Sequence, residues 1–224
     1  MNIIGPDSLV FGVDDVDACS DYFTDYGLSP AGNGVFEALD GTSVVIKPRD
    51  DASLPAPLET ASMLRKTVYG VADQPTLDAI ADELGTDRDV TTLGDGSLET
   101  VDDLGFALGF QITVRKALDL PAETINSPGV AAHRPINAPG ADPDAAPKPR
   151  TLSHVVYFVP DLEKFENFYA ERLGFVTTDR FTGVGPFRHD EPRDRPADMY
   201  GADVTRHVGP DHPAHVLLPI IPKK

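Results

Sequence analysis

A pattern of strand, helix and terminating glycine occurs three times along this chain, and it restricts the fold to tandem strand-helix-strand units. The clearest copy begins with the apolar run 152–159, which is followed by Pro160 and Asp161. Apolar residues then recur at helical spacing: Leu162, Phe165, Phe168, Tyr169 and Leu173. Gly174 follows where a helix would stop. The pattern predicts a strand that leads into a helix and then into further strands.

Two weaker copies precede this one. Residues 8–28 align with it so that Asp15 matches Asp161 and Gly27 matches Gly174, while Ser8 takes the place of His154. Residues 66–85 repeat the pattern, with a proline in the first turn of the helix and a glycine at its end. Short alternating runs bounded by glycine are typical of strands, and they lie at 35–39, 42–47 and 108–114.

Three βαβββ units in tandem resemble the vicinal oxygen chelate superfamily, which includes glyoxalase I, the bleomycin-resistance proteins and the extradiol ring-cleavage dioxygenases. The chain is most similar to two-domain extradiol dioxygenases, whose N-terminal pair of modules lacks metal and whose C-terminal pair holds Fe(II). The resemblance implies an α+β fold of tandem βαβββ modules, with mixed curved sheets and helices on the outside. We therefore expect a metal-free pair at 1–120, a linker at 121–150, and at 151–224 the first module of a catalytic-type domain with an irregular tail.

The linker has its own signature. Residues 127–150 contain six prolines and almost no large apolar side chain, so they cannot form a regular helix or a central strand. We expect a proline-stiffened connector here.

The resembled metal site is a facial triad of two histidines and one carboxylate, which leaves positions open for substrate and dioxygen. The resemblance places the first histidine at His154. It assigns the other two ligands to a fourth module, and only 37 residues follow Phe187, fewer than such a module needs. His212 and His215 in the tail are substitute candidates, with Asp211 as the carboxylate. The alternative is that they are solvent-facing residues, because no rigid element is predicted around them.

The last residues allow two interpretations. Residues 188–207 are charged and interrupted by proline, whereas 214–221 form an apolar run that predicts one strand. That strand would complete the third module. Alternatively, the segment after Phe187 is foreign to the fold, as a shifted reading frame or an early stop would produce.

Composition limits the partners and the compartment. The net charge of −17 argues against binding to nucleic acid or to an anionic membrane. The dispersed acidic residues indicate a solvated, salt-adapted surface, with cation binding as the alternative. The chain shows no apolar run of membrane-spanning length and no secretory signal, so a cytoplasmic protein is expected. Its single cysteine, Cys19, falls on the inner stripe of the first helix and is expected to be buried.

The leading functional hypothesis is ring cleavage of a small aromatic substrate, a catechol-type diol, with Fe(II) or another divalent metal and O2. His154 would be one metal ligand. The competing hypothesis is a small-molecule-binding module without catalysis, or a truncated inactive relative. A homodimer or higher homo-oligomer would allow a second copy of the chain to supply missing ligands.

Overall fold

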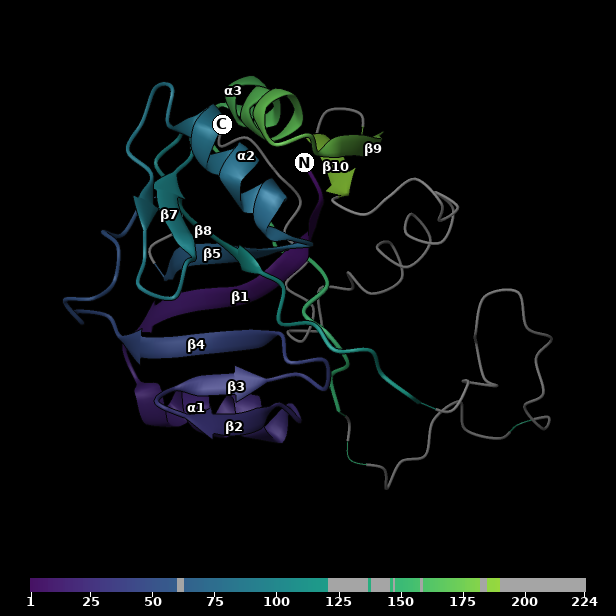
Figure 1. Cartoon of the computed structure of the whole chain (residues 1–224). Coiled ribbons are helices and arrows are strands. Elements are labelled where there is room, and N and C mark those ends of the chain that lie inside the picture. The colour runs from purple at the N-terminus through teal and green to yellow at the C-terminus, as the bar shows by residue number, and fades with distance from the viewer. Residues whose placement is uncertain are drawn as a thin grey trace.

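The computed structural model describes residues 1–59, 63–120, 148–157, 159–181 and 185–189, together with Asn137 and Ala146. Within these residues the dominant element is one open mixed sheet of eight strands in the order β2-β3-β4-β1-β5-β8-β7-β6 (Figure 1). Two helices accompany this sheet and a third helical segment lies beside the second of them (Figure 1). The expected α+β class is confirmed, but the first two modules share one sheet instead of having one each.

The sheet is built from two copies of the same unit. The first copy contains β1 (Ile3–Val13), α1 (Val16–Asp25), β2 (Ser29–Gly32), β3 (Val35–Glu37) and β4 (Ser43–Pro48). The second contains β5 (Leu64–Val71), α2 (Gln74–Leu84), β6 (Thr91–Thr92), β7 (Leu98–Val101) and β8 (Ala107–Ile112). In each copy the first strand pairs in parallel with the last, and the antiparallel β1/β5 pair joins the two copies. The two predicted βαβββ units are therefore confirmed.

An aspartate caps the N-terminus of each helix, as the aligned sequences suggest. The side chains of Asp15, Asp73 and Asp161 accept hydrogen bonds from backbone N–H groups three residues further on. Two of the three terminating glycines, Gly27 and Gly174, have φ values of 98° and 78°, in the left-handed region that other residues avoid.

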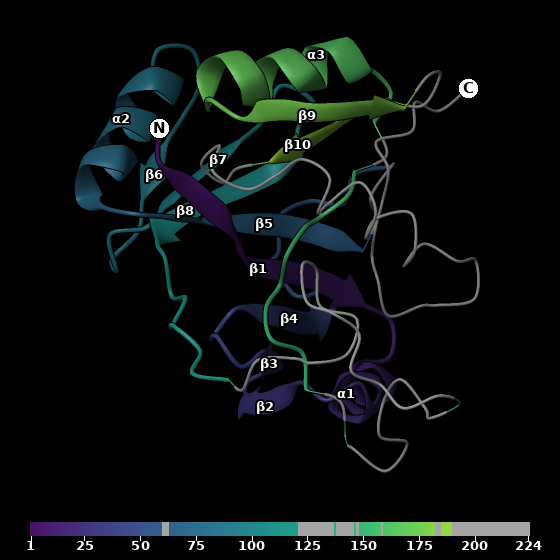
Figure 2. The same cartoon turned by 90° about the vertical axis from the view of Figure 1, so that its right-hand side faces the viewer.

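The third unit departs from the prediction at its start. Its helix is present as α3 (Leu162–Asn167), which continues as a π-helical turn, η1 (Phe168–Arg172). The strands β9 (Val176–Phe181) and β10 (Gly185–His189) follow and pair with each other (Figure 2). The prediction of a strand at 152–159 is wrong for the residues described there, which belong to no ladder. The side chains of Thr42 and Arg115 bond the backbone of Leu152 instead. The apolar residues Tyr157 and Val159 are buried in the larger hydrophobic cluster.

Two hydrophobic clusters form the core. The smaller lies within the first module and includes Phe36 and Ile46. The larger combines the second module with the third unit, so that Ile80, Leu84 and Phe110 share one cluster with Phe165 and Phe168. The core thus continues across the predicted linker. The predicted domain limits stay a prediction, since most of 121–150 lies outside the described residues.

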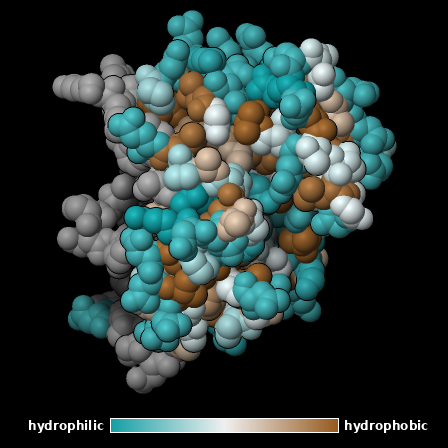
Figure 3. All heavy atoms as spheres, turned by 90° about the vertical axis from the view of Figure 1, so that its left-hand side faces the viewer, coloured by the Kyte–Doolittle hydropathy of each residue, from teal (hydrophilic) through white to brown (hydrophobic). Residues whose placement is uncertain are grey.

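The surface is mixed in character. On the face shown in Figure 3, hydrophobic side chains lie in separate groups among hydrophilic ones. None of the helices in the described part of the chain is long and apolar enough to cross a membrane.

Candidate functional site

His154 lies on the segment that connects the linker to α3, and it is half-buried. Its Nδ1 atom lies 2.8 Å from the hydroxyl of Ser153. The chain is attached to the first two modules on both sides of this histidine. Leu152 is hydrogen-bonded through its backbone to Thr42 and Arg115, and the buried Tyr157 donates a hydrogen bond to Thr67. The histidine predicted as a metal ligand is therefore on a segment that the scaffold holds in place.

The described residues do not by themselves fit a facial triad. No group of three His, Cys, Asp or Glu side chains among them lies close enough to hold a metal ion. His154 contributes one imidazole, whereas the other candidates, His212 and His215, lie outside the described residues. Of the three predicted ligands, only His154 lies within the described part of the chain.

The first two modules have other chemistry at the position that His154 occupies in the third. Counting seven residues back from each capping aspartate gives Ser8 and Lys66. Ser8 accepts a hydrogen bond of 3.1 Å from the hydroxyl of Ser43 on the neighbouring strand. Lys66 forms an ion pair with Glu99. In both modules a partner within the protein satisfies the polar side chain at this position.

A small hollow adjoins this position in the second module. It measures about 230 Å³ out to open solvent, and its lining includes Lys66, Thr67, Phe106 and Tyr157. Tyr157 comes from the third unit, so the hollow lies where the third unit meets the second. Its polar groups are already paired, because Tyr157 bonds Thr67 and Lys66 bonds Glu99.

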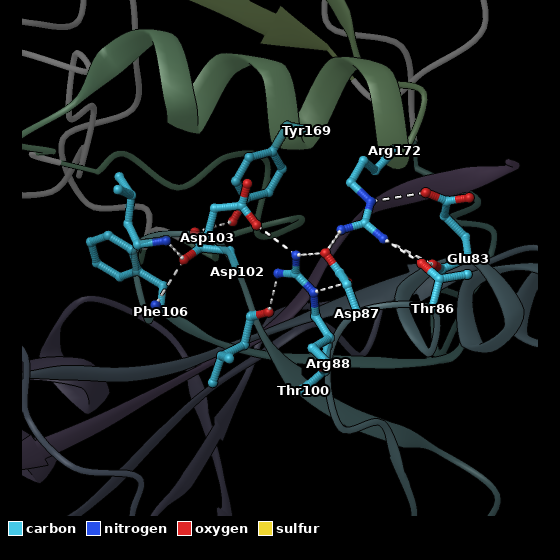
Figure 4. Close-up of polar contacts among 12 residues, drawn as sticks. Glu83, Thr86, Asp87, Arg88, Thr100, Asp102, Asp103, Phe106, Tyr169 and Arg172 are labelled. Carbon is cyan, nitrogen blue, oxygen red and sulfur yellow. Dashed lines mark hydrogen bonds and ion pairs between the residues drawn. The ribbon is translucent and has the colours of Figure 1, made fainter.

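A buried carboxylate, Asp102, lies at the same junction (Figure 4). It is only 4% exposed and accepts hydrogen bonds from the backbone N–H groups of Leu104 and Phe106, both at 2.9 Å. The hydroxyl of Tyr169, from η1, lies 3.3 Å from its other oxygen. Burial raises the pKa of Asp102 to about 6, and this effect outweighs the hydrogen bonds, which favour the charged form.

Two arginines complete the junction (Figure 4). Arg172 of η1 contacts Glu83 at 2.8 Å and Asp87 at 2.6 Å. Arg88 contacts Asp87 and Asp103 and lies over the ring of Phe168, 4.9 Å from its centroid. Hydrogen bonds from Arg88 and Arg172 hold the pKa of Asp87 well below its usual range. These contacts attach the third unit to α2 and the loop that follows it.

Cys19 requires a correction. The expectation of a buried thiol is wrong, because Cys19 is only partly buried and none of the residues of α1 is fully buried. One side of α1 packs on the smaller hydrophobic cluster, but no residue of the helix is fully buried. Desolvation, with Asp15 and Asp14 nearby, raises the pKa of the thiol, so the thiolate is disfavoured.

Sequence reasoning missed the residues that attach the third unit. Asp7 is a charged residue within the apolar strand β1, and that isolation was a signal that it would need partners. Asp102, Arg88 and Arg172 gave no comparable signal, because they occur in stretches rich in charge.

Two βαβββ modules in one mixed sheet, followed by the helix and two strands of a third unit, match the fold of vicinal oxygen chelate structures. Residues 151–220 match the family model described as the Glyoxalase/Bleomycin resistance protein/Dioxygenase superfamily. This part of the chain therefore carries the sequence signature of the superfamily, and the predicted resemblance is confirmed. Because the match continues to residue 220, it argues against the alternative of a foreign segment after Phe187.

Solved structures with the same fold include a glyoxalase and catechol dioxygenases. The Mn(II)-bound glyoxalase from Novosphingobium aromaticivorans is 16% identical and superposes with a TM-score of 0.58, covering 85% of this chain and 59% of its own. BphC, a halotolerant catechol dioxygenase, is 17% identical with a TM-score of 0.56, covering 85% and 62%. A catechol 2,3-dioxygenase is 17% identical with a TM-score of 0.54, covering 92% and 76%.

At these identities the likeness shows the fold alone. The chain spans about three fifths of the length of the first two structures. No curated protein matches the chain significantly in sequence.

Proposed function

We propose that this chain belongs to a ring-cleaving dioxygenase of the extradiol type, acting on a catechol-type diol with Fe(II) and O2. The observation that carries the proposal is the order of the modules. Two complete βαβββ modules precede a third unit that carries His154 seven residues before its capping Asp161. The catechol dioxygenases among the structural neighbours support the same substrate class.

In this proposal the first two modules form a scaffold. The polar residue at the ligand position of each module bonds another residue of the same module: Ser8 pairs with Ser43, and Lys66 pairs with Glu99. The first two modules would then serve to hold the third unit in place. When bound, Fe(II) would supply Lewis-acid chemistry to the site. His154 would supply one imidazole to it, and the other ligands would come from outside the described residues or from a second copy of the chain.

A metal titration with His154→Ala tests the proposal. The full chain would be titrated anaerobically with Fe(II), and oxygen consumption would be followed after catechol is added. We expect weak Fe(II) binding by the wild type and a further loss of roughly 10- to 100-fold in the variant, because one ligand is removed. Turnover should be low in both, since one described ligand cannot hold the metal well. Ser8→Ala, at the matching position of the first module, should bind Fe(II) like the wild type.

The outcomes separate the hypotheses. Fe(II) affinity that is the same with and without the His154 imidazole would refute its role as a ligand. Stoichiometric iron with rapid catechol cleavage, abolished in His154→Ala, would support the function and show that tail histidines or a second copy complete the site.

A specific observation favours a second candidate, a non-catalytic small-molecule-binding protein. In the first two modules, the polar residue at the ligand position is already bonded within the protein: Ser8 to Ser43 and Lys66 to Glu99. If this candidate is correct, catechol should bind equally well in the presence of a strong chelator and to the His154→Ala variant. Equilibrium dialysis with catechol would measure this.

A further inference from the structure

We propose that the first two modules position His154 through a peptide clamp at Leu152, formed by Thr42 and Arg115 and supported by the buried carboxylates of Asp40 and Asp7. The clamp is a property of the described residues. Its relevance to a metal rests on the function proposed for His154.

The N–H side of the clamp is a relay of two hydrogen bonds. The backbone N–H of Leu152 donates to the hydroxyl oxygen of Thr42 at 2.7 Å. That hydroxyl donates in turn to Asp40 at 2.7 Å, and the same carboxylate oxygen accepts the backbone N–H of Thr42 at 3.0 Å. Because its proton is committed to Asp40, the Thr42 hydroxyl presents a lone pair to Leu152. Thr42 is fully buried and Asp40 is 5% exposed, so the two bonds between them are shielded from solvent.

The carbonyl side of the clamp is a guanidinium. Nη2 of Arg115 donates to the carbonyl oxygen of Leu152 at 2.9 Å and to that of Pro6 at 3.0 Å. One nitrogen thus joins β1 to the third unit. Nη1 of the same side chain donates to the hydroxyl of Thr151 at 3.1 Å. Two neighbouring residues ahead of His154 are therefore fixed by a single arginine.

The fully buried Asp7 fixes the arginine. Its carboxylate lies 3.5 Å from Nε of Arg115, which is buried and forms no hydrogen bond with any described residue. Asp7 also accepts hydrogen bonds from Gln111, Thr113 and the backbone of Val114 at 2.9 to 3.1 Å. These donors hold the carboxylate in one orientation, and its charge keeps the guanidinium in place.

A second anchor lies on the other side of the histidine. Tyr157 is 4% exposed, its hydroxyl bonds Thr67, and its ring lies 4.8 Å from that of Phe106. His154 therefore lies two residues after one attachment and three residues before the other. A chain of two residues spans at most about 7 Å, so the clamp limits where the imidazole can be.

The test compares Thr42→Val with Thr42→Ser in the full chain, without metal. Valine keeps the size of threonine but removes both hydrogen bonds of the hydroxyl, whereas serine retains them. In NMR hydrogen exchange, we expect protection of the Leu152 amide to fall about 5- to 10-fold in Thr42→Val and to be restored in Thr42→Ser. The imidazole resonances of His154 should shift in the valine variant alone. Thr100→Val, which removes a buried hydroxyl bonded to Asp89, is the matched control and should leave both signals unchanged.

A second variant covers the case in which Thr42→Val does not fold. Arg115→Lys keeps the charge facing Asp7 but cannot bond Leu152, Pro6 and Thr151 together, so it should shift the His154 resonances in the same way. A folded Thr42→Val or Arg115→Lys protein with wild-type exchange at Leu152 and unchanged imidazole signals would overturn the clamp. Fe(II) titration of the same proteins tests the function separately. If His154→Ala binds Fe(II) like the wild type while Thr42→Val shifts the imidazole, the ligand role fails and the clamp stands.

Discussion

Asp102 illustrates what a single buried charge does at the junction between units. In the unfolded chain its pKa lies near 3.8, whereas in the folded protein burial raises it to about 6. The folded state therefore favours the protonated form. The stability that this carboxyl contributes is fully present below pH 3.8 and is lost as the pH rises through about 6. Asp87 has the opposite dependence, because its pKa is lowered and its contribution disappears as the pH falls.

Asp102→Asn should remove this pH dependence. Relative to the wild type, the variant should gain stability between pH 4 and pH 8, by up to about 3 kcal/mol, since two pKa units correspond to roughly that free energy. Urea unfolding of both proteins at the two pH values measures the difference. If the variant and the wild type differed in unfolding free energy by the same amount at pH 4 and pH 8, the raised pKa of Asp102 would be contradicted.

Gly70 gives a second prediction for a single residue. A Cβ atom placed there would overlap the carboxylate of Asp7, which cannot move without losing its donors. Gly70→Ala should destabilise the protein by about 1–3 kcal/mol, the usual cost of overpacking. Gly94→Ala is the control, because no atom lies within 4 Å of a Cβ at that position. Thermal unfolding of the two variants should differ clearly, and equal melting temperatures would show that Asp7 has room to shift.

The third unit is held to the second module although its strands β9 and β10 do not pair with the eight-stranded sheet. Its helical segment, α3 and η1, buries Phe165, Phe168, Tyr169 and Leu173 against the second module. The exposed ion pairs of Arg172 add little free energy, because solvent screens them. The apolar contacts therefore supply most of the attachment, and the charges select the orientation.

Phe165→Ala should weaken this attachment strongly. The side chain is 3% exposed and packs on the rings of Tyr157, Tyr169 and Phe106, so truncation should cost about 3–5 kcal/mol. Leu118→Ala, at a residue that is 37% exposed, should change stability by less than about 0.5 kcal/mol. Denaturant unfolding checks both values, and a small effect of Phe165→Ala would mean that the third unit is only loosely packed.

The local pattern predicted the elements better than their contacts. Helical spacing identified α1, α2 and α3, and a glycine marked the end of each, because these signals arise within a few residues of sequence. The apolar run 152–159 predicted a strand, yet the backbone of Leu152 bonds the side chain of Thr42, 110 residues away. The bond between Tyr169 and Asp102 spans 67 residues. Such contacts depend on how the units pack, which periodicity does not encode. Of the candidate site, the sequence therefore indicated His154 but not the residues that hold it.

At the scale of the whole molecule, the larger hydrophobic cluster crosses the predicted linker. The backbone N–H groups of Leu39 and Asp40 also bond the carbonyls of Pro149 and Arg150, so the end of the linker is attached to the first module. Among the described residues, the first two modules and the third unit are therefore packed against one another.

Limited proteolysis tests whether these contacts hold the units together. We expect limited digestion to cut within 128–147, a proline-rich stretch without predicted regular structure, before it cuts the flanking units. The two fragments should then elute together in gel filtration, because the shared core and the Arg172 contacts remain. Fragments that separate under native conditions would show that the shared core is too weak to hold them.

The Lys66–Glu99 pair has a consequence for how such modules diverge. An ammonium and a carboxylate already meet at the residue of β5 that aligns in sequence with His154. Exchange of Lys66 for histidine would place an imidazole on β5, near a carboxylate from β7, without altering the backbone. One substitution would thus give the second module an imidazole beside a carboxylate, two of the side-chain types that bind divalent metals.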